Sequence, residues 1–304
     1  MPDPLAAPNS ARSAGRPARV TVAVITRDRR DGLLRTLDRL AALPERPPVV
    51  IVDNGSTDGT VTAARAHPVR ARVVAAGRNT GALGRNLAVR HAATPYVAFS
   101  DDDSWWAPGA LDHAADLFDA HPRLGLLAAR TLVGPLATED PLNSVLATSP
   151  LPPADDLPGR PVLGFLACAA VVRRQAFLDA GGFHRVLFFG GEESLLAYDL
   201  AARGWGVVHV PTVTAVHHPD PGERPGRSAV QRRNALLTDW LRRPPSIALR
   251  HTGRLVADAA RGEGEARRAL GGTLARLPRA LRYRRPLPGP VEQAARLLDD
   301  KDRT

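Results

Sequence analysis

The sequence predicts an α/β protein with a mostly parallel central sheet that carries helices on both faces. Residues 20–100 alternate apolar runs typical of buried strands with segments of helical periodicity. Such repetition builds right-handed β-α-β units. Polar clusters follow three of the apolar runs, at the strand ends where parallel sheets bind ligands. The chain of 304 residues is 44% hydrophobic, which is enough apolar surface for a real core.

The elements of the first hundred residues follow directly from these patterns. Short apolar runs bounded by turn residues predict strands, and leucines or alanines at three- and four-residue spacing predict the helices between them. The predicted strands are 21–25, 49–52, 72–75 and 96–99, and the predicted helices lie around 33–40, 61–67 and 84–92.

The pattern is less regular in the second part of the chain. A helix is predicted to begin near Pro108, and residues 134–161 are rich in proline and polar side chains, which predicts a long loop. A helix over 194–203 and a strand over 207–216 follow. After Pro219 the chain consists of basic helical segments broken by prolines.

Charge divides the chain into two parts. Residues 1–220 are neutral overall, whereas residues 221–304 carry the whole net charge of +10, so the C-terminal part is a separate electrostatic unit. We therefore predict a disordered leader over 1–18, a folded domain over 19–220 and a basic helical extension over 221–304.

Composition excludes several classes of protein. The single Cys168 excludes a disulfide framework, and the longest uncharged apolar run, Val162–Val172, is too short to cross a bilayer. The N-terminus lacks the apolar stretch of a secretory signal, so the predicted compartment is the cytoplasm. Neither the dinucleotide-binding pattern G-x-G-x-x-G nor the phosphate-loop pattern G-x-x-x-x-G-K-[ST] occurs after the first strand.

Three adjacent carboxylates, Asp101-Asp102-Asp103, follow the strand at 96–99. Such neighbours repel one another by about 1 kcal/mol per close pair even in water. A solvated turn that caps the next helix would account for them, but oxygen ligands directly after a buried strand also suit Mg²⁺ or Mn²⁺. Asp53 ends another strand, where its carboxylate either forms a turn or accepts a hydrogen bond from a nucleobase or a ribose.

Two further clusters are candidates for chemistry. Glu192-Glu193 follows Gly190-Gly191 and opens a predicted helix. The helix dipole favours acids at that position, but a carboxylate that enters a cleft is also a candidate general base. His217-His218 ends the last predicted strand, and neutral imidazole is a ligand for divalent metals.

Together these segments resemble the motifs of family 2 glycosyltransferases of the GT-A fold, and in particular their bacterial rhamnosyltransferase-like branch. The matching segments are Val22–Thr26, Ile51–Asp58, Arg78–Gly81, Arg85-Asn86, Phe99–Asp103, Gly181–Phe183, Phe188–Glu193, His217-His218 and Arg232–Asn234. The resemblance covers residues 20–240. It implies a nucleotide-sugar half over 19–104 and an acceptor half over 105–220.

The resemblance also implies roles for single residues. The residues expected to bind the nucleotide sugar are Thr26, Asp53, Arg85, Asp101 and Asp102. The residues expected to bind Mg²⁺ or Mn²⁺ are Asp103, Asp101, His217 and His218, with Asp103 the expected direct ligand.

The acceptor side is where the resemblance is less complete. Glu193 matches the catalytic base, and the Glu-Glu pair leaves Glu192 open as the alternative. Leu195 stands where an acid is common in the family, and Asp199 where an arginine is common.

The implied activity is inverting transfer of a sugar from a nucleoside-diphosphate sugar to a hydroxyl of a glycan, a lipid-linked sugar or a natural product. A catalytically inactive sugar-nucleotide-binding protein is one alternative, favoured by the two departures. A sugar-phosphate nucleotidyltransferase should carry a glycine-rich basic loop after the first strand, and this chain does not. A nucleic-acid-binding protein is disfavoured by the neutral first 220 residues.

The basic extension contains a leucine stripe. Leucines at 270, 274, 277 and 281 line one face of a predicted helix, and arginines surround them. Such a helix either packs its leucines on the folded domain or lies on an anionic membrane surface. The second interpretation would add peripheral contact with the inner face of the cell membrane to the predicted cytoplasmic location.

Overall fold

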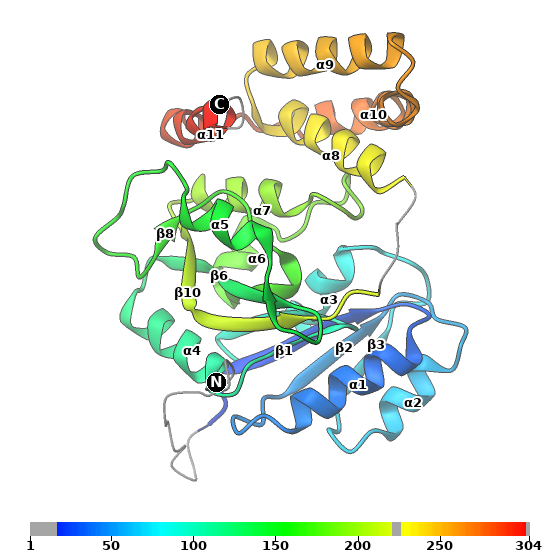
Figure 1. The fold of residues 1–304 in the computed structure, drawn as a ribbon, viewed down its shortest axis with the longest axis vertical. Coiled ribbons are helices and arrows are strands. Elements are labelled where there is room, and N and C mark those ends of the chain that lie inside the picture. The colour runs from blue at the N-terminus through cyan, green and yellow to red at the C-terminus, as the bar shows by residue number, and fades with distance from the viewer. Residues whose placement is uncertain (1–16, 221–225, 302–304) are drawn as a thin grey trace.

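Figure 1 shows the fold in a computed structural model, which describes residues 17–220 and 226–301. A ten-stranded mixed sheet has the order β3-β2-β1-β4-β9-β6-β10-β5, and two short strands, β7 and β8, pair with β6 and β10. The C-terminal helices α8–α11 form a separate layer at one end of the molecule, next to α7 (Figure 1). The predicted leader over 1–18 lies almost wholly outside the described residues.

The first half of the sheet confirms the predicted elements. Its strands pair in parallel, and they are β1 (Val20–Thr26), β2 (Val49–Asp53), β3 (Arg72–Ala75) and β4 (Tyr96–Asp101). Its helices are α1 (Arg30–Ala41), α2 (Thr60–Ala66) and α3 (Leu83–His91). Thr26 pairs with Asp53, and Ile25 pairs with Asp101, so the polar strand ends meet at one edge of the sheet.

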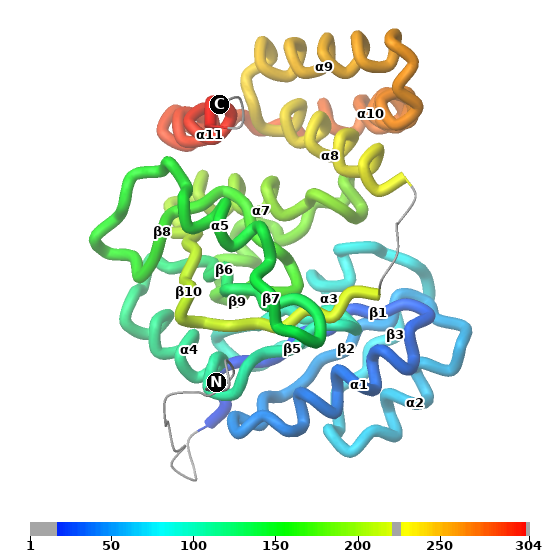
Figure 2. Tube along the Cα trace, in the orientation of Figure 1, coloured from blue at the N-terminus to red at the C-terminus, as the bar shows by residue number. Residues whose placement is uncertain are grey.

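The second half of the sheet also contains antiparallel strands, and Figure 2 traces the course of the chain through it. Its strands are β5 (Ser104–Trp106), β6 (Leu124–Val133), β9 (Ala170–Arg173) and β10 (Gly206–His217). β10 runs parallel to β6, whereas β9 lies antiparallel between β4 and β6. The helices of this half are α4 (Ala110–Ala120), α6 (Arg174–Ala180) and α7 (Glu193–Ala201), with a 3-10 turn at Ala167–Ala169.

The prediction of a long loop over 134–161 is wrong. This segment contains β7 (Thr138–Glu139), α5 (Pro141–Ala147) and β8 (Arg160–Pro161). The side chain of Asp140 accepts a hydrogen bond from the backbone N–H of Leu142 at 2.8 Å, and Pro141 occupies the first turn. An acidic cap followed by proline is a favourable helix start, so local sequence chemistry explains why this segment becomes helical.

Alternating strand residues build one apolar core on each face of the sheet. Ile25, Val52 and Phe99 pack in one core, and Val24 and Ile51 pack in the other. Full burial of such a side chain contributes about 1.5–3 kcal/mol. A shift of one residue in strand register would exchange the two faces, so this two-sided burial fixes the register that aligns the strand ends.

The C-terminal helices are α8 (Arg227–Arg242), α9 (Pro245–Ala260), α10 (Gly264–Arg282) and α11 (Gly289–Lys301). Leu237 and Leu241 of α8 share an apolar cluster with Leu195 of α7 and with Leu187 in the segment before α7. Ala295 of α11 belongs to one of the two main cores. Within residues 17–220 and 226–301, no helix has both the length and the hydropathy that a membrane span requires.

Candidate active site

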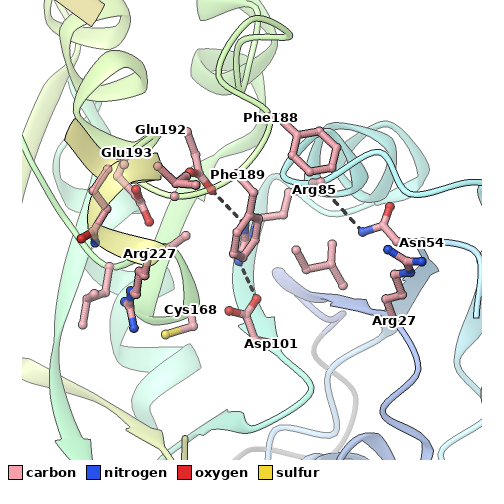
Figure 3. Close-up of a pocket in the computed structure, with 18 of the residues that line it drawn as sticks. Arg27, Asn54, Arg85, Asp101, Cys168, Phe188, Phe189, Glu192, Glu193 and Arg227 are labelled. Atoms are coloured by element: carbon pink, nitrogen blue, oxygen red, sulfur yellow. Dashed lines mark hydrogen bonds and ion pairs between the residues drawn. The ribbon is translucent and has the colours of Figure 1, made fainter. Parts of the chain in front are cut away.

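A cleft with a volume of about 1370 Å³ opens at the carboxyl ends of β1 and β4 (Figure 3). The sheet side of the cleft is lined by Thr26, Arg85, Asp101, Asp102, Asp103 and His217. The opposite side is formed by the segment Phe188–Glu193 and by residues of α8 and α10. Most of the residues singled out in the sequence therefore converge on one cavity.

Arg85 of α3 is buried at the centre of this site, with 1% of its surface exposed. Its Nη2 donates to Asp101 Oδ1 at 2.5 Å, and its Nη1 lies 3.7 Å from Glu192 Oε1 (Figure 3). The rings of Phe183 and Phe189 lie 5.6 and 6.0 Å from the guanidinium. Arg85 therefore links the end of β4 to the start of α7, while its Nε and Nη1 have no hydrogen-bond partner among the described residues.

Glu192 and Glu193 stand at the beginning of α7. Burial, and next to it the charge of Glu193, raises the pKa of Glu192 to about 8, although Arg85 opposes this. Burial likewise raises the pKa of Glu193. Glu192 is only 2% exposed and its Oε2 has no hydrogen-bond partner among the described residues, whereas Glu193 is partly exposed. A carboxylate with a raised pKa is suited to accept a proton near neutral pH.

Asp101 and Asp102 have different surroundings. Asp101 is held by Arg85, as described above. Asp102 is 9% exposed, with Oδ1 3.4 Å from Nε of Arg29. Burial raises the pKa of Asp102 to about 6, and repulsion from the carboxylates on either side adds to the shift.

Asp103 lies beside His217, whose Nε2 is 3.5 Å from Asp103 Oδ1, and both line the cleft. The ring of His218 instead lies 4.8 Å from that of Trp105, at a neighbouring pocket. Over the described ranges, no group of three His, Cys, Asp or Glu side chains is arranged to hold a metal ion. A carboxylate and an imidazole are nevertheless donors of the right chemistry for Mg²⁺ or Mn²⁺, which complete their coordination with substrate phosphates and water.

Asp53 is 2% exposed and forms the turn after β2. Its Oδ2 accepts hydrogen bonds from the backbone N–H groups of Gly55 and Ser56 at 3.1 and 3.0 Å. Its Oδ1 is buried and has no hydrogen-bond donor in the part of the chain that the structure describes. Asp53 itself does not line the cleft, although Thr26 and Asn54 do, so the observed role of its carboxylate is to form the turn after β2.

Asn234 of α8 had no role assigned from the sequence, although it belongs to the matching segment Arg232–Asn234. It is fully buried, and its Nδ2 donates to the backbone oxygens of Phe189 and Gly190 at 3.0 and 2.5 Å. Gly190 and Gly191 have φ angles of +86° and +81°, a conformation that favours glycine. Asn234 therefore holds the glycine turn that leads into the glutamate pair.

The two positions that depart from the family pattern both face α8. Leu195 is 1% exposed and shares an apolar cluster with Leu237 and Leu241. Asp199 accepts two hydrogen bonds from Arg242, Nε to Oδ1 at 2.6 Å and Nη2 to Oδ2 at 2.8 Å. These side chains stabilise the contact between α7 and the C-terminal helices.

The fold and the cleft define a glycosyltransferase of the GT-A class, with the acidic turn after β4 and a carboxylate pair at the start of α7. The sequence model of glycosyl transferase family 2 matches residues 21–180. The chain therefore belongs to glycosyl transferase family 2, and the predicted fold and enzyme class are confirmed.

Relatives and solved structures agree with this assignment. The chain is 30% identical over 223 residues to an N-acetylglucosaminyl-diphospho-decaprenol L-rhamnosyltransferase of Mycobacterium tuberculosis, over 61% of this chain and 71% of the relative. TarS 1–349 of S. aureus with UDP-GlcNAc superposes with a TM-score of 0.59 at 18% identity, over 91% of this chain and 83% of that one. The mannosyltransferase PcManGT of Pyrobaculum calidifontis with GDP-Man and Mn²⁺ has a TM-score of 0.54 at 23% identity, over 94% and 75%.

Proposed function

We propose that the chain transfers a sugar, with inversion, from a nucleoside-diphosphate sugar to an acceptor hydroxyl, and that Glu193 is the general base. The observation that carries the proposal is the pair Glu192-Glu193 in the cleft, with raised pKa values and Arg85 between it and the acidic turn. Glu193 is the more exposed residue of the pair, which favours it for contact with the acceptor.

In this reaction the acceptor oxygen attacks the anomeric carbon while Glu193 takes the hydroxyl proton. The bond from the anomeric carbon to the diphosphate oxygen breaks, and the nucleoside diphosphate leaves. General-base assistance contributes about 10²–10⁴-fold to the rate. The guanidinium of Arg85 lies 3.7 Å from Glu192. Its positive charge stabilises the ionised form of one carboxyl of the glutamate pair.

The donor is expected at the strand ends. We propose that Thr26 and Asp53 hold the nucleoside, and that Arg85, Asp101 and Asp102 form the wall beside the sugar. PcManGT was solved with GDP-Man and TarS 1–349 with UDP-GlcNAc, which supports a nucleotide-sugar donor.

A divalent cation fits the donor atoms at the end of β4. Asp103 and His217 would hold Mg²⁺ or Mn²⁺, with Asp101 close by and His218 turned toward Trp105. When bound, such an ion supplies positive charge that stabilises a leaving diphosphate. The neighbour PcManGT was solved with Mn²⁺.

We propose a lipid-linked acceptor and peripheral contact with an anionic membrane, on the cytoplasmic side. The name of the mycobacterial relative specifies a diphospho-decaprenol acceptor. Two of the four leucines in the α10 stripe support the membrane contact, because Leu274 and Leu281 are 58% and 47% exposed. Leu270 instead packs against the apolar cluster of α8 and α9. Exposed leucines flanked by arginines are suited to an anionic lipid surface.

The test compares Glu193→Gln with Glu192→Gln, and uses Glu263→Gln, an exposed glutamate of the C-terminal part, as the control. Glu193→Gln should leave calorimetric binding of the nucleoside diphosphate intact and lower turnover by at least about 10²-fold. Glu192→Gln should do less. A larger loss in Glu192→Gln would move the base to that residue, and full activity of both variants would reject the pair as the base. Donor binding without any turnover by the unaltered chain would identify an inactive sugar-nucleotide-binding protein.

A further inference from the structure

The wall of the cleft opposite the acidic turn is basic. It is formed by α8 and α10, and three arginines of these helices, Arg227, Arg233 and Arg268, line the cavity. Figure 3 shows Arg227 on the same side of the cleft as Glu193. This wall is distinct from the strand ends proposed to hold the donor.

A glycine allows two of the basic side chains to come together. Arg268, Gly272 and Arg276 are spaced four residues apart on α10, so they form one strip along the helix. A Cβ atom at Gly272 would lie 2.8 Å from Cδ of Arg233 and 3.9 Å from Nη1 of Arg276. The stem of Arg233 from α8 therefore crosses α10 at Gly272 and brings its charge near Arg276.

Two of these charges, Arg233 and Arg276, are not neutralised by the described residues, whereas Arg268 forms an exposed ion pair with Glu265 of the same helix. Arg233 donates to Asn234 Oδ1 at 2.9 Å and to Leu187 O at 3.3 Å, and Arg276 donates to Gly272 O at 3.3 Å. Within residues 17–220 and 226–301, neither arginine has a carboxylate partner. Burial, and then the charge of Arg276, lowers the pKa of Arg233.

Two neighbouring arginines, one in α8 and one directly after it, are paired. Arg232, next to Arg233, contacts Asp258 and Glu263, and Arg243 contacts Glu292 and Asp299. Arg233 and Arg276 therefore differ from these two neighbours, because neither has an acidic partner among the described residues. Like charges held close together are unfavourable, and an external anion offsets that cost.

The glutamate pair lies between this strip and the acidic turn. The segment that leads into α7 contacts Arg233 through Leu187 O, and its far end contacts Arg85 through Glu192. Arg233, Arg268 and Glu193 therefore line the same cleft, with the segment before α7 in contact with both Arg233 and Arg85.

We propose that Arg233 and Arg268, backed by Arg276, bind a phosphate or diphosphate group of the acceptor. Arginine is well suited to phosphoryl oxygens because its planar fork donates two parallel hydrogen bonds. The inference rests on the proposed function, since it concerns the acceptor of that reaction. It assigns the anion of the acceptor to α8 and α10, separate from the donor diphosphate.

The test measures binding of citronellyl diphosphate to the full chain by calorimetry, with the donor site first saturated by nucleoside diphosphate and Mn²⁺. The variants are Arg233→Gln and Arg268→Gln. The control is Arg254→Gln, which removes one exposed charge from α9 and lies outside the cleft. Each cleft variant should weaken the probe at least about tenfold, while the control changes it little and nucleoside-diphosphate affinity is unchanged in all three.

Inorganic pyrophosphate forms the second arm, because it offers the same oxygens without a lipid. Tighter binding of citronellyl diphosphate supports the acceptor assignment, and equal binding overturns it in favour of a site for free phosphate. Equal affinity of the probe for the cleft variants and for Arg254→Gln also overturns the proposal. If nucleoside diphosphate itself fails to bind the unaltered chain, the proposed function fails instead. Arg233→Lys checks for folding defects. Lysine keeps the positive charge but lacks the planar guanidinium that donates two parallel hydrogen bonds, so this variant should bind citronellyl diphosphate with intermediate affinity.

Discussion

Replacing Arg242 by methionine should destabilise the protein far more than an ordinary surface change. The side chains of Arg242 and Asp199 are 6% and 8% exposed, and two hydrogen bonds of 2.6 and 2.8 Å join them. Methionine retains much of the apolar stem but leaves the Asp199 carboxylate buried without its partner. Removing one member of such a pair costs about 3–5 kcal/mol.

Urea unfolding followed by circular dichroism measures this loss. The control is Arg232→Met. The Arg232 side chain is 31% exposed and those of its partners Glu263 and Asp258 are 47% and 23% exposed, and ion pairs that reach solvent contribute about 0–1 kcal/mol each. The double variant Asp199→Leu, Arg242→Met should recover most of the lost stability because no charge remains buried. The reasoning is refuted if Arg242→Met costs no more than Arg232→Met, or if the double variant is no more stable than the single one.

Three further outcomes are expected. Asp103→Asn should remove the Mn²⁺-dependent part of nucleoside-diphosphate binding in calorimetry, because it weakens the donor set that Asp103 forms with His217. The free energy of unfolding should fall as the pH rises from about 4.5 to about 8, because Glu192 keeps a proton in the folded state that the unfolded chain releases; Glu192→Gln should remove that part of the slope in urea titrations. Leu274→Ser with Leu281→Ser should weaken co-sedimentation with anionic liposomes at low salt and leave donor binding unchanged.

Each of these three predictions would be contradicted by a specific result. Unchanged affinity of Asp103→Asn, with and without chelator, would remove the metal from the proposed mechanism. An identical pH slope in Glu192→Gln would show that Glu192 does not retain its proton on folding. A chain that stays in the supernatant with every lipid at low salt would exclude the membrane contact.

The first half of the sheet could be predicted because each strand is a short β-branched run that ends in a turn, as in Val49–Asp53. Strands β6 and β9 escaped prediction. Leu124–Val133 is buried along most of its length, so no alternation distinguishes it from a buried helix. Ala170–Arg173 lies between two strands distant in sequence, and that insertion depends on contacts that local patterns do not report.

The candidate site could be predicted from the sequence only in part, because some of its contacts also depend on tertiary packing. Strand-end carboxylates such as Asp101 converge because parallel strands end at one edge. The pairing of Arg85 with both Asp101 and Glu192, and the crossing of Arg233 at Gly272, arise from tertiary packing. In α10 the spacing of the leucines indicated an apolar face, but the alanine face lies against α8 because small side chains allow the two helices to approach closely.

The hydrogen bonds from Asn234 to the turn before the glutamates have a consequence for chimeric enzymes. A C-terminal segment taken from another family member would carry a different α8. That helix would not be matched to the turn at glycines 190 and 191, which accepts the hydrogen bonds of Asn234 in this chain. Recombination at a boundary near residue 220 therefore separates two pieces that depend on each other. A functional hybrid must inherit Phe188–Glu193 and α8 from the same parent.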